Sequence, residues 1–359
     1  MMKYVMYILL AVGALAVVAE FLHASPLLIF IGAGLGLIPL AGILGDGTEA
    51  LAKYTGPRLG GLLNATLGNA VELIITTLAL WQGAVNPAVR ESSLLLVKAS
   101  ITGSIMGNVL LILGASIFLG GLKHGVQRFD RSQSGINMSM LLLAVIAISF
   151  PSIFSQAIDE VNHPGVEYLT LGISAVMIVV YALSIVFTQR LGHVTEVSHD
   201  SGHAPAWSKR QAIIILIVAT AAIALLSETL VGSVEPVVTQ FGISEFFLGI
   251  ILIPIVGNVA EHLVAVQAGM RNDMELSLAI SWGSSLQIAL FVTPLLVFIS
   301  LALGNPMTLT FTTFEVVTLV AVSLIAAFIS QDGESNWLEG VMLLSLYLIV
   351  AIAAFFVPV

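Results

Sequence analysis

The sequence predicts an all-α integral membrane protein with about eleven transmembrane helices: an extra first helix followed by two inverted five-helix repeats. Of its 359 residues, 58% are hydrophobic and only 9% are charged, whereas soluble domains carry roughly 25% charged residues. An internal repeat is the second indication, because Gly68–Glu72 (Gly-Asn-Ala-Val-Glu) returns as Gly257–Glu261 (Gly-Asn-Val-Ala-Glu). The third is the uneven distribution of Lys and Arg between the connections.

Hydropathy and turn residues divide the chain into apolar segments of membrane-spanning length. The first is expected to be a retained helix rather than a signal peptide, because its apolar stretch is long and a poor cleavage site follows it. The expected spans are 3–22, 27–53, 60–85, 92–121, 133–153, 165–190, 209–235, 243–270, 274–303, 308–330 and 337–358.

Lys and Arg predict the orientation of these spans. Ten of the 12 basic residues lie at the N-terminus or in connections on its side of the membrane, and only Arg90 and Lys98 lie toward the other side. Basic residues concentrate on the cytoplasmic side of membrane proteins. We therefore expect a multi-pass protein of the cell membrane with a cytoplasmic N-terminus and an outer C-terminus.

The order of the spans predicts the organisation of the chain. Residues 1–25 form the extra helix, 26–190 the first repeat, 191–208 a cytoplasmic linker and 209–359 the second repeat. Because five is odd, the two repeats enter the membrane in opposite directions. The linker is expected to be a flexible connection. A regulatory metal site or pH sensor is the alternative, since it contains His193, His199, His203, Glu196 and Asp200.

The repeated motif carries the predicted chemistry. Glu72 and Glu261 lie inside apolar spans, where an ionisable side chain is costly and usually functional. Asn69 and Asn258 precede them by three residues, so each Asn shares a helix face with its Glu. Two such pairs form an oxygen cage suited to a hard cation such as Ca²⁺. Without a cation, burial favours the protonated carboxyl, so protons and Ca²⁺ are expected to compete for both glutamates.

Several further polar residues are candidates for supporting roles. His262 follows Glu261 directly and either relays protons or hydrogen-bonds a neighbouring helix. A lone buried Glu is often only a structural hydrogen-bonding group, but two in matching settings favour an ion site. The polar residues expected to orient the carboxylates or line the water path are Ser104, Asn108, Ser285 and Gln287.

Carboxylates nearer the ends of spans are candidates for vestibules that concentrate cations. Asp46 and Glu49 lie toward the cytoplasmic end of the second span, and Glu228 and Glu235 toward the outer end of the seventh. Ordinary interfacial acids are the alternative. Glu315, inside the tenth span, needs a partner that the sequence does not identify.

Composition excludes several classes of protein and site. The chain has no Cys, which removes disulfides, thiolate metal sites and cysteine catalysis. The acidic residues are spread along the chain and no basic patch indicates nucleic acid. Gly32–Gly36 resembles a nucleotide-binding loop but lies in an apolar span, where helix packing explains it. No cofactor is expected; the expected partners are Ca²⁺, H⁺ and the lipid bilayer, and the chain is a monomer or a homo-oligomer.

The two motif regions, Leu62–Ile74 and Pro254–His262, resemble the signature repeats of the cation/proton exchangers, the CAX branch of the Ca²⁺/cation antiporter superfamily. The resemblance covers essentially the whole chain. It implies an 11-helix fold, export of Ca²⁺ in exchange for H⁺, and Glu72 and Glu261 as central ligands and proton carriers. It also favours a functional His262, because Gly-Asn-x-x-Glu-His is the usual form of the second repeat.

A sodium-coupled Ca²⁺ exchanger of the same superfamily is the nearest alternative. Sodium-coupled relatives typically have Gly-Ser/Thr-Ser-x-Pro-Glu, whereas Val71 and Ala260 precede the Glu here and the ninth span offers Gln287 rather than a central acid. Fewer central charges favour proton coupling. From other classes, an intramembrane carboxylate hydrolase needs no inverted repeat, and a passive cation channel would not saturate as an alternating carrier does.

Overall fold

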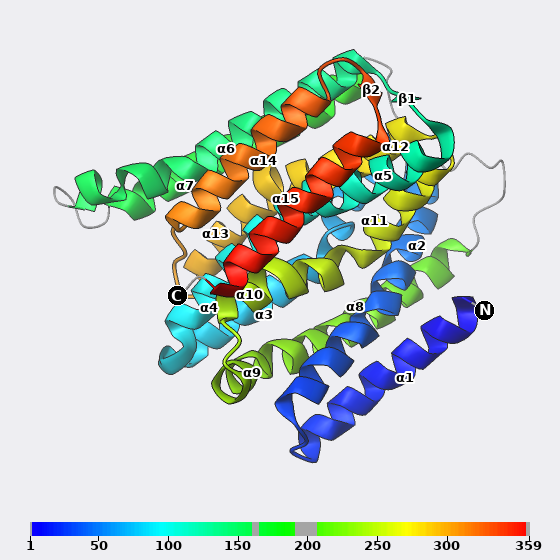
Figure 1. The fold of residues 1–359 in the computed structure, drawn as a ribbon. Coiled ribbons are helices and arrows are strands. Elements are labelled where there is room, and N and C mark those ends of the chain that lie inside the picture. The colour runs from blue at the N-terminus through cyan, green and yellow to red at the C-terminus, as the bar shows by residue number, and fades with distance from the viewer. Residues whose placement is uncertain (1, 160–164, 191–206, 357–359) are drawn as a thin grey trace.

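The computed structural model describes residues 2–159, 165–190 and 207–356, nearly all of them helical (Figure 1). Within these residues, nine continuous helical stretches are long and apolar enough to cross a membrane, and Ala70–Val85 and Thr313–Ile329 are shorter apolar helices. Together they form the eleven helices expected for this fold class. The histidines and acids of the predicted linker (His193, Glu196, His199, Asp200 and His203) lie outside the described residues.

The first helix and the first half contain α1 (Met2–Phe21), α2 (Pro26–Leu67), α3 (Ala70–Val85), η1 (Pro87–Val89), α4 (Arg90–Met106), η2 (Gly107–Ile112), α5 (Leu113–His124), α6 (Arg131–Asp159) and α7 (Gly165–Arg190). The second half contains α8 (Lys209–Gly232), α9 (Val234–Phe241), α10 (Glu245–Phe247), η3 (Leu248–Leu252), α11 (Ile253–Met270), α12 (Met274–Gln287), η4 (Ile288–Val292), α13 (Thr293–Ala302), α14 (Thr313–Ile329) and α15 (Trp337–Phe356). Two short strands, β1 (Gln127–Arg128) and β2 (Glu334–Ser335), pair antiparallel.

Helix packing between the two halves is reciprocal. α2 packs on α8, and α6 packs on α14, so equivalent helices meet. Each of the other contacts has a counterpart in which the two halves exchange roles. α2 packs on α11 as α8 packs on α3, and α5 packs on α15 as α13 packs on α7. In the same way, α4 packs on α14 as α12 packs on α6. This pattern is what two inverted repeats related by a pseudo-two-fold axis produce, and it brings the two motif helices, α3 and α11, into contact.

Two hydrogen bonds between connections agree with the predicted side of the membrane for each connection, and so with an odd number of spans. The Tyr54 hydroxyl donates to the Trp207 carbonyl at 3.0 Å, and both residues lie in connections predicted for the cytoplasmic side. Arg90 donates through Nε to the Asn305 side chain at 2.7 Å, and both lie in connections predicted for the outer side. Each contact thus joins connections assigned to the same side of the membrane.

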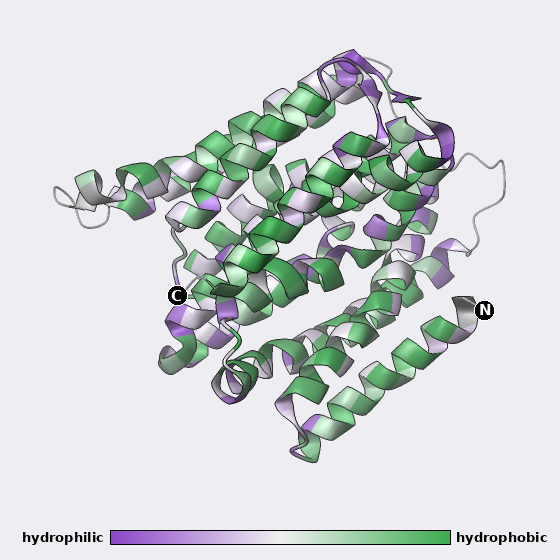
Figure 2. Cartoon of the chain, viewed as in Figure 1, coloured by the Kyte–Doolittle hydropathy of each residue, from purple (hydrophilic) through white to green (hydrophobic). Residues whose placement is uncertain are grey.

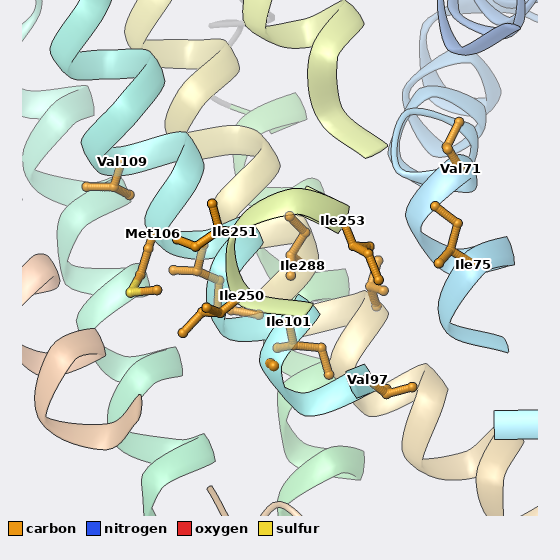
Figure 3. Close-up of a cluster of buried hydrophobic side chains, with 14 of the residues drawn as sticks. Val71, Ile75, Val97, Ile101, Met106, Val109, Ile250, Ile251, Ile253 and Ile288 are labelled. Carbon is orange, nitrogen blue, oxygen red and sulfur yellow. The ribbon is translucent and has the colours of Figure 1, made fainter. Parts of the chain in front are cut away.

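Apolar side chains form both the surface and the interior. Figure 2 shows hydrophobic residues along the lengths of the helices and hydrophilic residues mainly at their ends and connections. Inside, α3, α4 and η3 meet through buried aliphatic side chains (Figure 3), among them Val71, Ile75, Val97, Ile101 and Ile250. Large apolar residues also cover the exterior, including Leu143, Ile153, Val176, Leu183, Leu348 and Phe356. An apolar interior inside an apolar surface is the expected pattern for a protein surrounded by lipid.

The boundary between the second and third spans differs from the prediction. We expected a break at Thr55–Arg58, but α2 continues through these residues to Leu67, and the break falls at Gly68 and Asn69. Pro57 is tolerated in a membrane helix because neighbouring groups can satisfy the backbone that it frees. The helix therefore ends inside the motif itself.

Three of the spans contain π-helical turns. η2 and η4 occupy Gly107–Ile112 and Ile288–Val292, in the fourth and ninth spans, just after Ser104 and Ser284. A third, η3, lies directly before α11. Such turns are frequent at functional sites, and here they adjoin the residues that surround the two motif glutamates.

Candidate functional site

Both motif glutamates lie at the centre of the molecule with an unsatisfied oxygen. Glu72 is in the first turn of α3 and is 1% exposed, and Glu261 is in the middle of α11. In each, Oε2 is buried without a hydrogen-bond partner among the described residues. A buried carboxylate oxygen without a partner is costly, so both oxygens are placed to accept a proton or a cation.

Glu72 receives hydrogen bonds through its other oxygen from α4. The Ser104 hydroxyl donates to Glu72 Oε1 at 2.5 Å, and the Ser100 hydroxyl lies 3.5 Å from the same atom. The Asn258 amide and the Glu261 carboxylate of the second half lie close enough to Glu72 to interact with it electrostatically. The two glutamates therefore belong to one site.

Two hydrogen bonds cross between the halves in matching positions. Asn258 Nδ2 donates to Ser104 Oγ at 3.1 Å, and Ser284 Oγ donates to Asn69 Oδ1 at 3.2 Å. Ser284 is also a near neighbour of the Glu261 carboxylate, whereas Ser104 donates a hydrogen bond to Glu72. Each motif Asn therefore binds the serine that lies beside the glutamate of the opposite half.

A chain of side-chain hydrogen bonds extends from this pair toward His262. Asn108 Nδ2 donates to Ser284 Oγ at 3.0 Å, and Asn108 Oδ1 lies 3.2 Å from His262 Nε2. At the other end, Asn69 Nδ2 donates to Gln287 Oε1 at 2.7 Å. The imidazole is thus connected to the carboxylate site through Asn108 and Ser284 rather than by direct contact.

The two asparagines reach the centre by different local structures. Asn69 precedes the first turn of α3, and its side chain does not cap the helix, which leaves it available for Ser284 and Gln287. Asn258 lies inside α11, where Nδ2 also donates to the Pro254 carbonyl at 3.1 Å. The expectation that both motifs lie on continuous helices therefore holds for the second half only.

Ser285, a predicted supporting residue, is not brought to the cluster. Its hydroxyl donates to the Ser281 carbonyl of its own helix at 2.9 Å, while its neighbour Ser284 makes the contacts to Asn69 and Asn108. A sequence signal for this difference was present, because Ile101–Ser104 aligns with Ser281–Ser284 and pairs Ser104 with Ser284.

This difference gives a paired prediction. We expect Ser284→Ala to reduce cation exchange about tenfold, because it removes buried hydrogen bonds worth roughly 1–2 kcal/mol. Ser285→Ala should retain near wild-type exchange. Initial transport rates of both variants in reconstituted vesicles, normalised to protein content, test this; equal rates would contradict the assignment of Ser284.

The predicted vestibule carboxylates have different surroundings. Asp46 and Glu228 are exposed, and Glu49 forms an ion pair with Lys53 at 3.1 Å. Glu235 lines a cavity of about 280 Å³ between α3, α4, α8 and α9. Thus Glu49 is already neutralised on its own helix, whereas Glu235 faces an open volume.

Glu315, for which the sequence identified no partner, binds the start of its own helix. The Thr312 amide donates to Glu315 Oε2 at 2.8 Å in a capping box, and the Thr102 hydroxyl donates to Oε1 at 3.1 Å. Glu315 therefore joins α14 to α4. It lies apart from the two motif glutamates.

Two reciprocal halves that bring paired carboxylates, amides and hydroxyls to a buried centre define a secondary cation transporter. The chain belongs to the sodium/calcium exchanger protein family, which it matches over residues 25–189 and 211–356.

The similar proteins within this family indicate a particular branch of it. The chain is 40% identical to a Ca²⁺/H⁺ antiporter of Aphanothece halophytica, over 96% of this chain and 94% of that one. It is also 40% identical to the Ca²⁺/H⁺ antiporter ChaA of Bacillus subtilis (strain 168), over 99% of both chains. Among solved structures, native YfkE superposes with a TM-score of 0.83 at 38% identity and covers 98% of this chain and 100% of its own. The predicted membership of the cation/proton exchanger branch is confirmed.

Proposed function

We propose that this protein is a Ca²⁺/H⁺ antiporter that exports Ca²⁺ from the cytoplasm by alternating access. Protons and Ca²⁺ compete for Glu72 and Glu261. The observation that carries this proposal is the pair of buried Oε2 atoms without hydrogen-bond partners, one on each glutamate. The relatives named Ca²⁺/H⁺ antiporters support the choice of ions, and they are transporters rather than enzymes.

The hydrogen bonds around the site indicate how the two ions exclude one another. Ser104 donates to Glu72, and the Asn69 oxygen is engaged by Ser284. Ca²⁺ takes six to eight oxygen ligands at roughly 2.3–2.6 Å, so its entry requires these oxygens to turn from one another toward the ion. Protonation of the carboxyls removes the charge that holds Ca²⁺ and lowers the cost of keeping both carboxyls buried without an ion, while their neighbours bond one another. Each ion therefore favours a different set of contacts.

The orientation of the protein follows from its basic residues. We place the N-terminus in the cytoplasm and the C-terminus outside the cell membrane, with 191–208 as the cytoplasmic linker between the repeats. Support comes from the ten Lys and Arg residues on one side of the spans, against Arg90 and Lys98 toward the other. No cofactor is required, because Ca²⁺ and H⁺ are the transported substrates.

Proteoliposomes test the proposed exchange directly. We expect uptake of ⁴⁵Ca²⁺ to follow an imposed pH gradient, to saturate with Ca²⁺ and to be unaffected by a sodium gradient. Uptake that requires sodium would assign the protein to the sodium-coupled mode of its family instead. Electrical current without saturation would indicate a channel and overturn antiport.

His262 provides a prediction about pH dependence. His262 is 7% exposed and contacts the site through Asn108, so we expect His262→Ala to shift the pH at which exchange is fastest. Asn108→Ala should shift it in the same direction, because it interrupts the same connection. Exchange rates measured across a range of pH test this. Lower rates with an unchanged pH profile would show that His262 serves packing only.

A further inference from the structure

Most of the buried polar atoms that lack a hydrogen-bond partner lie in one part of the molecule. Within the described residues, two of these atoms are the Oε2 oxygens of the motif glutamates, and two others are Ser174 Oγ and Ser227 Oγ. All the rest belong to α12 or to the paired strands β1 and β2, namely Ser277 Oγ, Ser281 Oγ, Trp282 Nε1, Gln127 Oε1 and Ser335 Oγ. Such atoms are few in native proteins, and ordered water commonly satisfies them. Their concentration along one helix therefore indicates a place where water binds.

The strand atoms lie at the start of α12, on the side that the basic residues assign to the cytoplasm. Gln127 and Ser335 face one another in the strand pair, and β1 packs on α5 and α12 (Figure 1). Gln127 Nε2 donates to the side chain of Asn272, in the connection before α12, at 3.1 Å. Phe129, directly after β1, meets Trp282 edge to face with ring centroids 6.4 Å apart. The strand pair thus covers the cytoplasmic end of α12.

Serines continue this line of polar groups from the strand pair to the central site. Ser277, Ser281 and Ser284 follow one another at i, i+4 and i+7 of α12, so they share one face of the helix. Ser277 is 0% exposed and Ser281 is 1% exposed. Ser284 donates to Asn69 and is a near neighbour of the Glu261 carboxylate. The line therefore ends at a carboxyl whose Oε2 is itself unpaired.

The hydroxyls of Ser277 and Ser281 do not bind their own helix, as buried serines elsewhere in the protein do. Ser285, on the same helix, donates to the carbonyl four residues earlier at 2.9 Å. Ser149 and Ser323, buried in α6 and α14, make the same contact at 2.7 and 2.8 Å. Ser277 and Ser281 make no such bond. Because a buried hydroxyl without a partner is costly, both are placed to bind water.

The first half of the chain has no equivalent line of hydroxyls. Ile101–Ser104 aligns with Ser281–Ser284, so Val97 is the counterpart of Ser277 and Ile101 that of Ser281. Both counterparts are 0% exposed and belong to the buried aliphatic cluster (Figure 3). The path along α4 toward the outer side is therefore apolar where the path along α12 toward the cytoplasm is polar. Helix packing in the repeat does not require serine at these positions.

We propose that Ser277 and Ser281 hold a file of water that carries protons between the central glutamates and the cytoplasm, and we call it the α12 proton route. Each hydroxyl accepts a proton from one neighbouring water as it gives its own to the next, so the serines end unchanged. Ca²⁺ needs six to eight oxygen ligands, which one buried hydroxyl per turn does not supply. The route therefore passes protons and not Ca²⁺. It rests on the proposed exchange of Ca²⁺ for H⁺ and separates the paths of the two ions on the cytoplasmic side.

Alanine variants test the route through transport kinetics in proteoliposomes. We expect Ser277→Ala and Ser281→Ala each to lower the maximum rate of ⁴⁵Ca²⁺ uptake under a pH gradient about two- to tenfold, as for one lost hydrogen bond. The Ca²⁺ concentration that gives half the maximum rate should not change, because neither hydroxyl is a Ca²⁺ ligand. Ser174→Ala is the matched control, since Ser174 is equally buried and unpaired but lies on α7. Unchanged maximum rates, or an equal loss in Ser174→Ala, would overturn the route.

Thiol accessibility tests the same route without a transport assay and covers the case of an alanine variant that does not fold. The chain has no Cys, so Ser277→Cys, Ser281→Cys and Val97→Cys each introduce one thiol. Folded protein in membrane vesicles is treated with Ag⁺, which is small enough to follow water, from the cytoplasmic side. The remaining free thiol is then labelled with a fluorescent maleimide after unfolding. We expect Ag⁺ to block the thiols at positions 277 and 281 and to leave the thiol at position 97 free.

The two measurements separate failure of the route from failure of the proposed function. Thiols at 277 and 281 that stay as free as the thiol at 97 would overturn the route, even in a protein that exchanges Ca²⁺ for H⁺. Blocked thiols at 277 and 281 in a protein that does not exchange Ca²⁺ for H⁺ would support the water file and refute the proposed function.

Discussion

Replacing Glu72 or Glu261 with Gln should abolish Ca²⁺/H⁺ exchange, with a loss of more than about 100-fold, while the protein remains folded. Removing one charge from a buried, hydrogen-bonded charge interaction weakens binding by roughly 2–5 kcal/mol, and each 1.4 kcal/mol corresponds to a factor of ten. Gln keeps the shape of the side chain but can neither carry the negative charge that holds Ca²⁺ nor take up and release the proton.

Folding should not suffer from these substitutions, because a neutral amide is easier to bury than a carboxylate. Initial rates of ⁴⁵Ca²⁺ uptake in proteoliposomes under a pH gradient measure the effect, and thermal unfolding of the purified variants monitors the fold. Glu275→Gln, at an exposed position in the first turn of α12, is the matched control and should exchange normally. Retained proton-driven uptake in either motif variant would exclude the two-glutamate mechanism.

Gly103→Ala should have the second-largest effect, because Gly103 is where α4 and η3 approach most closely. A Cβ added at Gly103 would overlap the Ile250 carbonyl and would lie 2.7 Å from the Pro254 ring. The Ile250 carbonyl belongs to the backbone and cannot change rotamer as a side chain can. We therefore expect a loss of stability at or above the roughly 1–3 kcal/mol typical of overpacking. Gly103 precedes Ser104, so the displacement also moves a direct partner of Glu72.

The control for this prediction lies one turn further along the same span. A Cβ at Gly107 meets no atom within 4 Å, so Gly107→Ala should be neutral or slightly stabilising. Thermal unfolding and initial exchange rates of both variants provide the comparison. If Gly103→Ala were as stable and active as Gly107→Ala, the close approach of α4 and η3 would be wrong.

The fold class and the two central glutamates could be predicted from the sequence for simple physical reasons. Long apolar runs must form helices in lipid, because no water is there to satisfy the backbone. A repeated carboxylate is conspicuous in such a run, because burying it is so costly. The eleven apolar helices within the described residues confirm the first prediction. The roles of Glu72 and Glu261 remain proposals, although the structure places them together at the centre.

The break in the first motif could not be predicted in this way. The Pro of Thr55–Arg58 was the stronger local signal for a break, yet α2 continues to Leu67 and the chain leaves helical geometry at Gly68 and Asn69. Both motifs contain Gly-Asn, but Gly257 and Asn258 stay within α11. Neighbouring helices decided which signal prevailed, because they supply the partners of Asn69.

Local sequence likewise could not predict whether Ser284 or Ser285 binds Asn69. Both are small, polar and adjacent, and only the rotation of α12 against α3 determines which one reaches Asn69. The halves also differ in their packing: Gly103 meets the Ile250 carbonyl, whereas its counterpart Gly283 faces open space. Equivalent sequences therefore occupy unequal surroundings, as alternating access requires of an inverted-repeat carrier at any one moment.

By itself, the sequence determined that this protein is a helical membrane carrier with one costly carboxylate in each half. Both features follow from composition and residue spacing, because lipid favours helices in long apolar segments and makes a charged side chain there costly. Only the tertiary structure decided which serines and amides reach those carboxylates, where the motif helix breaks, and that Thr229 of α8 donates a hydrogen bond to Glu20 of the first helix. These contacts join residues as far apart as Asn69 and Gln287, and their geometry depends on how the helices pack rather than on any local preference of the chain.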